Sequence, residues 1–399
     1  MARILVLGGG GAQGSAAVMW LAKDPQVSEV VCADLNIERA RQLTGNLEGD
    51  KVHPQRIDAW KPDQVFEASK GVDVVINMVA SWVGERSPTL NVMDAALKNG
   101  AHYVDVATAL REEEDEMLKL SSTWDDAGLT AIFDLGKTPG ITNILARYAA
   151  DKLDHVDEIR VKTCLDVMSK KEFLVMWSPI AAIPGWSSAG LVYENGEYKK
   201  FPPFSGEETY TFPGDPQGPC KGYLADHEEI WTLPRFIKNV CYVEFKHYSH
   251  RLQTFKTLGE LFGSEEPIDV RGVKVAPLDV LIKVIPPPAE LPEKIDAGII
   301  DNAYSCCVVE VKGEKAGKER QYTLSCPTSL GEVDGILPGT QPESILVGTP
   351  PAVAAAMLVQ GEIKTRGVMP PECLNPEPFL ANLTAKGIRI YERVERRLG

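Results

Sequence analysis

A short apolar run followed by four glycines constrains the fold of this chain more than any other feature. Residues 3–7 (Arg-Ile-Leu-Val-Leu) are typical of a strand buried on both faces of a parallel sheet. A glycine-rich segment, residues 8–14, comes next, and residues 15–22 have helical composition. A strand, a glycine turn and a helix in this order predict a site for a dinucleotide diphosphate, because the helix N-terminus offers unpaired N–H groups.

The glycines of this turn fit the pattern G-x-G-x-x-G at three positions, and each position has an expected role. We expect Gly9 to make the tight turn, Gly11 to let the backbone approach the diphosphate, and Gly14 to let helix and strand pack closely. Ala12 and Gln13 complete the predicted cofactor turn. The pattern alone is weak, so the residues that follow it must decide.

A second strand-like run, residues 29–33, ends at Asp34, 20 residues beyond Gly14. A carboxylate there can accept hydrogen bonds from the adenosine ribose and repels a 2′-phosphate, which favours NAD over NADP. Arg39 and Arg41 are close enough in sequence to keep NADP possible. The alternative is an ordinary glycine turn followed by a strand-end aspartate.

Strand-like and helix-like segments continue to alternate through the first third of the chain. Further strands are expected at residues 52–57, 73–77, 103–106 and 130–133, and helices at residues 86–98 and 111–126. This alternation predicts an α/β fold with a Rossmann-type doubly wound parallel sheet.

Ligands of such sheets bind beyond the carboxyl ends of the strands, so residues that follow the expected strands are candidates for the cofactor site. These residues are Asp58, Asn77, Met78, Val79 and Val106. Asp105, at the end of the fifth strand, is expected near the nicotinamide as a catalytic candidate. The alternative for Asp105 is a capping or packing role.

The pattern changes after residue 135. We expect a turn at residues 136–140, strands at residues 158–166 and 241–248, and a hairpin of residues 304–311 and 319–326. Helices are expected at residues 141–150, 251–261 and 277–285, whereas residues 184–222 are expected to form loops over a site. These runs predict an α+β domain on a mixed or antiparallel sheet.

Near the C-terminus, Thr349 is expected to cap an apolar helix that has Pro350 in its first position and ends before Gly361. A helix so apolar must dock on the rest of the chain, and we expect it on the dinucleotide domain. The predicted domains are therefore residues 1–135 with 340–399, which bind the dinucleotide, and residues 136–339, which form the inserted substrate-binding domain.

Composition narrows the class of partner. The chain has 42 basic and 56 acidic residues, and its net charge of −14 argues against nucleic-acid and membrane-surface partners. No apolar run approaches the roughly 20 residues that span a bilayer, and the N-terminus does not resemble a secretory signal, so we expect a cytoplasmic protein. The eight cysteines contain no C-x-x-C pair and the histidines no ligand spacing, so we expect free thiols and no metal.

Several segments resemble the saccharopine dehydrogenase family, and most closely its lysine 6-dehydrogenase branch. The resemblance lies in the glycine turn with Val-Val-Cys-Ala-Asp34, in Gly100-Ala-His-Tyr-Val-Asp105, in Asp134-Leu-Gly-Lys-Thr-Pro-Gly-Ile-Thr-Asn-Ile-Leu145, in Tyr248-Ser-His250, in Arg366-Gly-Val-Met-Pro-Pro-Glu372 and in Gly387-Ile-Arg-Ile390. It implies NAD(P)-linked oxidation of a carbon that bears an amine, a split Rossmann domain and an inserted domain that makes the dimer contact. One departure is Lys137, where a small apolar residue is common.

Two reactions fit this resemblance: deamination of lysine at its 6-position, and reduction of an imine to a secondary amine such as saccharopine or carboxynorspermidine. A third interpretation is a dinucleotide sensor without catalysis. Both reactions need a base with a pKa near the working pH. The candidates are His250 and Lys137 as catalytic residues, and His227, Arg235 and Asn143 as substrate-binding residues.

Each of these candidates also has a purely structural alternative. His250 could be a satisfied core or surface histidine, and His227 a solvated histidine of an acidic loop. Lys137 could be a surface lysine and Arg235 a partner in a surface ion pair. Asn143 could make only a hydrogen bond at the start of a helix.

Overall fold

The computed structural model describes residues 1–80, 86–179, 181–182 and 189–396. The chain forms two compact units, one made of Met1–Arg147 and Ser344–Ile388, the other of Tyr148–Glu343 and Arg389–Gly399. Residues 340–399 were all expected in the dinucleotide domain, but the C-terminal strand of the chain belongs to the second unit.

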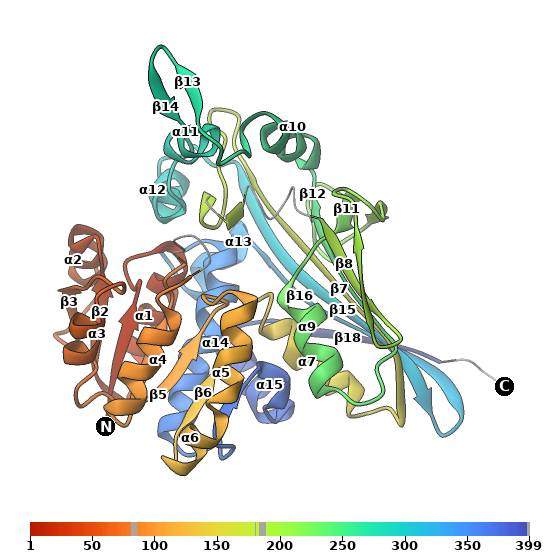
Figure 1. Ribbon diagram of the computed structural model, residues 1–399, viewed down its shortest axis with the longest axis horizontal. Helices are drawn as coiled ribbons and strands as arrows, with labels where there is room; N and C mark the ends of the chain where they lie inside the picture. The colour runs from red at the N-terminus through yellow and green to blue at the C-terminus, as the bar shows by residue number, and fades with distance from the viewer. Residues whose placement is uncertain (81–85, 180, 183–188, 397–399) are drawn as a thin grey trace. The chain divides into compact units, whose positions relative to one another are not determined.

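The first unit is built on a seven-stranded parallel sheet (Figure 1). Its strands are β1 (Ala2–Leu7), β2 (Val27–Asp34), β3 (Val52–Arg56), β4 (Val74–Asn77), β5 (His102–Asp105), β6 (Thr130–Ile132) and β17 (Gly367–Met369). Their order is β17-β6-β5-β4-β1-β2-β3, so the winding reverses between β1 and β4. The predicted doubly wound sheet is confirmed, with β17 as an additional strand that the sequence pattern did not reveal.

The first unit contains the following helices, of which those expected at residues 15–22, 86–98 and 141–150 begin and end within three residues of the expected positions. They are α1 (Ala12–Lys23), α2 (Ile37–Gly45), α3 (Pro62–Ala68), α4 (Thr89–Lys98), α5 (Arg111–Lys119), α6 (Ser121–Asp126), α7 (Ile141–Ala150), α14 (Pro342–Val359), η2 (Pro371–Cys373) and α15 (Pro376–Ala385). The single helix expected at residues 111–126 is divided at Leu120 into α5 and α6.

The predicted start of the C-terminal helix is wrong. α14 begins at Pro342, and Thr349, Pro350 and Pro351 lie inside it. The Thr349 hydroxyl donates to the carbonyl of Ile345 at 2.5 Å and accepts the indole N–H of Trp20 at 2.9 Å, so it links two helices instead of capping one. Burial of the surrounding helix outweighs the local preference of proline for a first turn.

By length and composition, α14 could cross a membrane, but 89% of its apolar window is buried inside the protein. Its contact with α1 is close, since a Cβ added at Gly348 would lie 2.5 Å from the carbonyl oxygen of Gln13. α14 is therefore a core helix.

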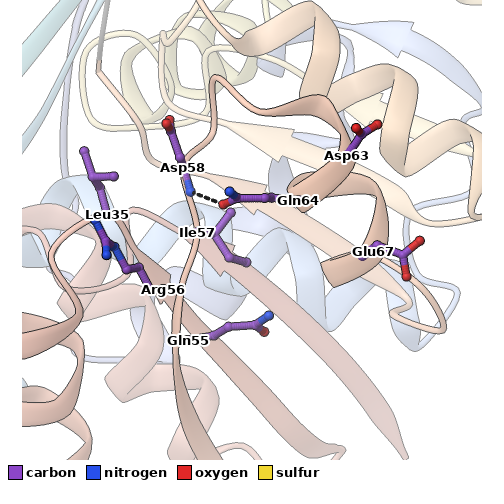
Figure 2. Close-up of a pocket in the computed structure, with 8 residues that line it drawn as sticks. All are labelled: Leu35, Gln55, Arg56, Ile57, Asp58, Asp63, Gln64 and Glu67. Carbon is purple, nitrogen blue, oxygen red and sulfur yellow. Dashed lines mark hydrogen bonds between the residues drawn. The ribbon is translucent and has the colours of Figure 1, made fainter.

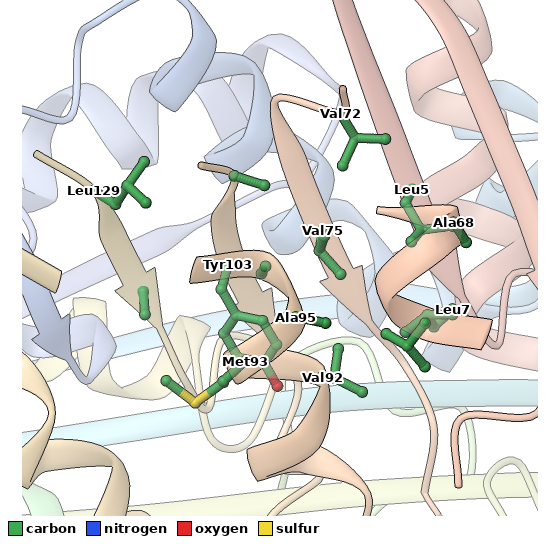
Figure 3. Close-up of a cluster of buried hydrophobic side chains, with 14 of the residues drawn as sticks. Leu5, Leu7, Ala68, Val72, Val75, Val92, Met93, Ala95, Tyr103 and Leu129 are labelled. Carbon is green, nitrogen blue, oxygen red and sulfur yellow. The ribbon is translucent and has the colours of Figure 1, made fainter. Parts of the chain in front are cut away.

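The core of the first unit lies on both faces of the sheet. Figure 3 shows Leu5 and Leu7 of β1 with Val75 of β4, packed against residues such as Ala68 of α3 and Val92 of α4. Ile4 and Val6 alternate with them and are also fully buried. A strand buried on both faces needs apolar residues at every position, which explains the continuous apolar run of β1.

The second unit contains a nine-stranded mixed sheet (Figure 1). Its strands are β7 (His155–Met168), β8 (Gly190–Glu194), β9 (Glu197–Phe201), β10 (Glu208–Tyr210), β11 (Cys220–Leu224), β12 (Tyr242–Ser249), β15 (Asn302–Lys315), β16 (Lys318–Ser329) and β18 (Tyr391–Arg396). Seven of them follow the order β10-β11-β12-β7-β15-β16-β18, and β8 pairs with β12 and β9. β12 runs parallel to β7, whereas the other pairs are antiparallel. The predicted mixed sheet is confirmed.

Residues 184–222 were expected to be loops, and this prediction is wrong where the segment forms strands. Residues 184–188 lie outside the described residues, but β8 to β11 all fall between residues 190 and 224. These strands are three to five residues long, with glycine-containing turns between them, so their alternation is too short to recognise. Cross-strand pairs such as Tyr193 and Tyr198, with ring centroids 5.3 Å apart, stabilise them.

The second unit also contains short helices and one small hairpin. These are α9 (Glu228–Phe236), α10 (Leu252–Phe262), β13 (Ile268–Val270), β14 (Val273–Val275), α11 (Pro277–Val284), η1 (Pro288–Glu290), α12 (Leu291–Asp296) and α13 (Leu330–Ile336). Leu252 and Phe255 of α10 and Leu278 of α11 form one apolar cluster with Leu165 and Val167 of β7.

Candidate functional site

The glycine turn has the close approaches expected of a diphosphate cradle, but the roles of its glycines shift by one position. The left-handed residue is Gly8, with φ of 75°, and not Gly9. At Gly9 a Cβ would come within 3.0 Å of the Cys32 sulfur, so this position must be small for packing. At Gly14 a Cβ would lie 2.1 Å from the Gly8 carbonyl oxygen, which only glycine allows. α1 then starts at Ala12, with Gly11 as its N-cap.

Asp34 ends β2 directly beside this turn. Its carboxylate accepts the backbone N–H of Gly10 at 3.1 Å and that of Asn36 at 2.8 Å. Burial raises the pKa of Asp34, and the two hydrogen bonds and the charge of Arg39 act in the opposite direction. A Cβ added at Gly10 would lie 3.1 Å from the Asp34 carboxylate and 3.1 Å from the Cβ of Arg39, so both residues are next to the turn.

A pocket of about 680 Å³ opens where β2 and β3 end. Figure 2 shows its lining, which consists of Leu35, Gln55, Arg56, Ile57, Asp58, Asp63, Gln64 and Glu67. The backbone N–H of Asp58 donates to the Gln64 side chain at 3.0 Å, and its carboxylate accepts the N–H of Trp60 at 3.0 Å. Asp58 was predicted at the cofactor site, and the structure places it in a cavity at the carboxyl edge of the sheet.

Asn77 ends β4 but is completely buried and used within the protein. Its amide donates to the hydroxyls of Thr108 at 3.0 Å and Tyr103 at 3.2 Å, and its oxygen accepts the N–H of Val79 at 3.2 Å. Asn77 therefore fixes the ends of β4 and β5. The backbone of Met78 lies against the glycine turn, since its carbonyl oxygen is 3.0 Å from a Cβ placed at Gly8.

Asp105 has a similar internal role. The carboxylate is buried and accepts the Tyr103 hydroxyl at 2.9 Å and the backbone N–H groups of Asp134 at 3.0 Å and Ala107 at 3.1 Å. Ala107 and Asp134 are both left-handed, with φ of 61° and 64°. Burial raises the pKa of Asp105 to about 6, against the effect of these bonds. The placement favours the packing alternative over the catalytic role.

Lys137 lies in a tight loop between β6 and α7 and is fully buried, so the surface alternative is wrong. The loop closes with a hydrogen bond from the Gly136 N–H to the Pro139 carbonyl at 2.8 Å, and the Thr138–Pro139 bond is cis. At Gly140 a Cβ would lie 2.0 Å from the Gly136 oxygen.

Asn143 holds this loop from the first turn of α7. Its oxygen accepts the Gly140 N–H at 2.9 Å, and its amide donates to the Glu372 carboxylate at 3.0 Å. Both side chains are fully buried. The structure thus supports the helix-start hydrogen bond for Asn143. It also shows Glu372 as a partner of Asn143, a role that the sequence did not predict. Val106 lies beside the same loop, with its Cβ 3.6 Å from the Cβ position of Gly136.

In the second unit, His250 follows β12 and meets two buried carboxylates. Its Nε2 is 3.0 Å from Asp215 Oδ2, and its backbone N–H donates to Asp166 at 2.8 Å. Asp166 also accepts the Ser249 hydroxyl at 2.5 Å, and burial raises the pKa of Asp166. Sequence reasoning missed both aspartates, because Asp166 is inside a strand pattern and Asp215 inside a predicted loop.

The eight cysteines are free, and six of them are buried. Two of the buried thiols, Cys164 and Cys220, lie next to the His250 and Asp215 pair, with their sulfur atoms 3.8 Å apart.

His227 precedes α9 and is not solvated, contrary to one interpretation of its acidic context. Its ring stacks on Phe245 at 3.8 Å, and Nδ1 meets the carboxylates of Glu228, at 3.0 Å, and Glu229. Burial alone would lower the pKa of His227, but the two carboxylates outweigh it and raise the pKa to about 10. Arg235 lies exposed in the last turn of the same helix.

Two family models match almost the whole chain. The saccharopine dehydrogenase NADP binding domain matches residues 4–132, and the saccharopine dehydrogenase C-terminal domain matches residues 136–388.

Relatives of similar length carry the names of polyamine enzymes. Carboxyaminopropylagmatine dehydrogenase of Synechocystis sp. is 27% identical over 99% of this chain and 98% of its own length. Carboxynorspermidine synthase of Vibrio alginolyticus is 26% identical over 85% of this chain and 82% of its own.

Solved structures share the fold. Saccharopine dehydrogenase (L-Glu forming) of Saccharomyces cerevisiae superimposes with a TM-score of 0.68 and 16% identity, covering 99% of this chain and all of that one. Homospermidine synthase of Legionella pneumophila, in complex with NAD, gives 0.66 and 15%, covering 98% and 91%. The chain therefore belongs to the saccharopine dehydrogenase family and is an NAD(P)-dependent oxidoreductase.

Proposed function

We propose that this protein reduces an imine to a secondary amine that carries a carboxylate, using NADH or NADPH. The observation that carries the proposal is the match to carboxyaminopropylagmatine dehydrogenase over 99% of this chain and 98% of the relative, which includes both units. The match to carboxynorspermidine synthase supports the same reaction class. The substrates would be a small primary amine and a carbonyl compound with a carboxylate.

The cofactor would lie on the first unit. Gly9 and Gly14 let the turn pack tightly within the protein, and the backbone N–H groups of the first turn of α1, which begins at Ala12, would bind the diphosphate. Asp34 would bind the adenosine ribose, and the pocket at Asp58 would receive the adenine end. The bound dinucleotide supplies the hydride. The carboxylate of Asp34 favours NADH, and Arg39 beside it makes NADPH acceptable.

For the substrate we propose residues on and before α9. The exposed Arg235 offers a planar guanidinium suited to a carboxylate. Glu228, whose side chain is 32% exposed, can pair with a cationic amine beside the buried Glu229. Asp105 and Asn143 would act through the backbone segments that they hold and would not touch substrate.

Two alternative functions must be distinguished from imine reduction by an assay. Lysine 6-dehydrogenase activity is the main alternative from the sequence resemblance, but the polyamine names of the full-length relatives favour imine reduction. A dinucleotide sensor would bind NAD(H) without turnover.

The test is the loss of reduced-nicotinamide absorbance with a carboxylate-bearing aldehyde and agmatine or a diamine. We expect turnover that requires both the aldehyde and the amine, and no reduction of NAD by lysine alone. Turnover of lysine alone would replace the proposal with the deaminase, and binding without turnover on any amine would leave the sensor.

We further propose that the protein forms a homo-oligomer through the second unit. Large apolar side chains are exposed together on α10, the β13–β14 hairpin and α11, namely Leu261, Phe262, Ile268, Val270, Val273, Val280 and Val284. A patch of this kind is typical of an interface. Light scattering should give a multimer for the natural chain and a smaller species for Val273→Asp, whereas a monomeric natural chain would contradict the proposal.

A further inference from the structure

Two thiols, a carboxylate and an imidazole from distant parts of the sequence meet in the second unit. Cys164 Sγ is 3.8 Å from Cys220 Sγ and 3.9 Å from Asp215 Oδ2, and Asp215 Oδ2 is 3.0 Å from His250 Nε2. The ligand atoms of Cys164, Asp215 and Cys220 all lie within 4.8 Å of one another. Both thiols are buried, with 0% and 3% of the residue exposed.

The strands bring these side chains to the same face of the sheet. β12 lies between β7 and β11, with Cys164 beside Tyr248 and Lys221 beside Ser249. The register therefore places Cys220 beside His250. Because side chains two residues apart in a strand share a face, Cys164 and Cys220 lean toward each other over β12.

The spacing of the sulfur atoms fits a shared metal ion better than a disulfide. Two thiolates at about 2.3 Å from one tetrahedral zinc ion are about 3.8 Å apart, and a thiolate and a carboxylate oxygen about 3.5 Å apart. A disulfide needs sulfur atoms about 2.05 Å apart and Cα atoms closer than about 7 Å, whereas strands separated by a third strand lie about 10 Å apart.

The surroundings hold the carboxylate in place and supply negative charge. Asp215 Oδ1 accepts the backbone N–H of Gln217 at 2.9 Å, and the Tyr304 hydroxyl donates to the carbonyl of Pro213 at 2.7 Å, so the loop that carries Asp215 is fixed at two points. A second buried carboxylate, Asp166, is 3.9 Å from Cys164 Sγ. Ligands oriented by such outer contacts are a feature of metal sites.

We propose that Cys164, Cys220 and Asp215 bind a zinc ion, with a water molecule in the fourth position and with His250 hydrogen-bonded to the Asp215 carboxylate. None of these residues belongs to the dinucleotide turn or to α9. Each thiol loses its proton to solvent when the metal binds, so binding releases protons and ties β7, β11 and the Asp215 loop together. The expectation of no metal rested on the missing C-x-x-C spacing, and 56 residues separate these two cysteines.

The test measures metal on the full-length protein. We expect about one zinc per chain by elemental analysis after purification without chelator. After chelation with thiols reduced, added Co²⁺ alone should give a thiolate-to-cobalt charge-transfer band, and Zn²⁺ should displace it. The Cys164→Ser/Cys220→Ser double variant should lose the band, and Asp215→Asn should weaken zinc affinity about 10-fold or more.

A matched control separates ligand loss from damage to the sheet. Cys307 and Cys326 are fully buried and face each other on β15 and β16, so Cys307→Ser/Cys326→Ser removes two buried thiols of the same sheet. This variant should keep the band. The proposal is overturned if the reduced natural chain binds Co²⁺ no better than the Cys164/Cys220 variant, or if mass spectrometry of the purified protein finds a Cys164–Cys220 disulfide.

Discussion

The glycine turn of the first unit and the thiol and carboxylate cluster of the second unit are both polar sites at strand ends, but they are assembled differently. The turn and its aspartate fall within residues 8–34, in one strand, turn, helix and strand. The cluster joins residues 164, 166, 215, 220 and 250 across three strands and a loop. The first has a local sequence pattern, and the second exists only when the sheet has formed.

A variant at Gly14 tests the local site with the largest expected effect. In Gly14→Ala the new Cβ would lie 2.1 Å from the Gly8 carbonyl oxygen, so the turn must open. Overpacking costs about 1–3 kcal/mol, and we expect NAD(H) affinity, measured by calorimetry, to fall roughly 10- to 100-fold. Gly45→Ala, which meets no atom within 4 Å, should bind normally. Equal affinity in both variants would mean that this turn does not hold the cofactor.

A variant at His227 tests how much a buried charge pair contributes to the stability of the second unit. Because its folded pKa is raised to about 10, its pairing with Glu229 and Glu228 stabilises the fold fully below pH 6.5 and progressively less as the pH rises to about 10. We expect His227→Gln to lower the free energy of unfolding by about 2–4 kcal/mol at pH 6 and by much less at pH 10.

The measurement for His227 is denaturant unfolding at both pH values. His155→Gln is a suitable control, because the His155 side chain is 41% exposed beside Asp157. A loss for His227→Gln that does not change between pH 6 and pH 10 would show that stacking on Phe245, and not charge, stabilises this residue.

Asp105 has a feature of each of the two compared sites. A local sequence pattern places it at the end of β5, but one of its hydrogen-bond partners, Asp134, is 29 residues away. An acid with a raised pKa favours the protonated form in the folded state, so the natural chain loses stability as the pH rises from about 4 to about 6. Asp105→Asn removes this loss, and the amide oxygen of the variant can still accept the Tyr103 hydroxyl. We expect the unfolding free energy of the natural chain to fall by about 1–3 kcal/mol more than that of the variant across this range. Parallel pH curves would contradict the role of burial.

The predictions that succeeded depend on patterns repeated along the chain. Strands such as β1 and β4 were recognisable because buried parallel strands are apolar at nearly every position and alternate with helices. β17 has only three residues, and β8 to β11 are short strands whose pairing depends on β12, so neither had a readable period. Asp166 was missed because it lies inside a recognised strand, and Asp215 because it lies in a segment expected to be a loop. Asn77 and Asp105 were placed at the right strand ends and expected near the cofactor, but their side chains bind groups within the protein.

The smallest expected effect concerns the choice between NADH and NADPH at the site formed by residues 8–34. Asp34→Asn keeps an acceptor for one backbone N–H but removes the charge that repels a 2′-phosphate, so we expect the ratio of NADPH to NADH affinity to rise about 10-fold. Arg39→Ala removes the nearby positive charge and should move the ratio in the opposite direction. Arg41→Ala is the control, because Arg41 pairs with Glu38 on the exposed side of α2. If Asp34→Asn and Arg39→Ala shift the ratio in the same direction, charge at the ribose does not set the preference, and the local pattern predicts only where the cofactor binds.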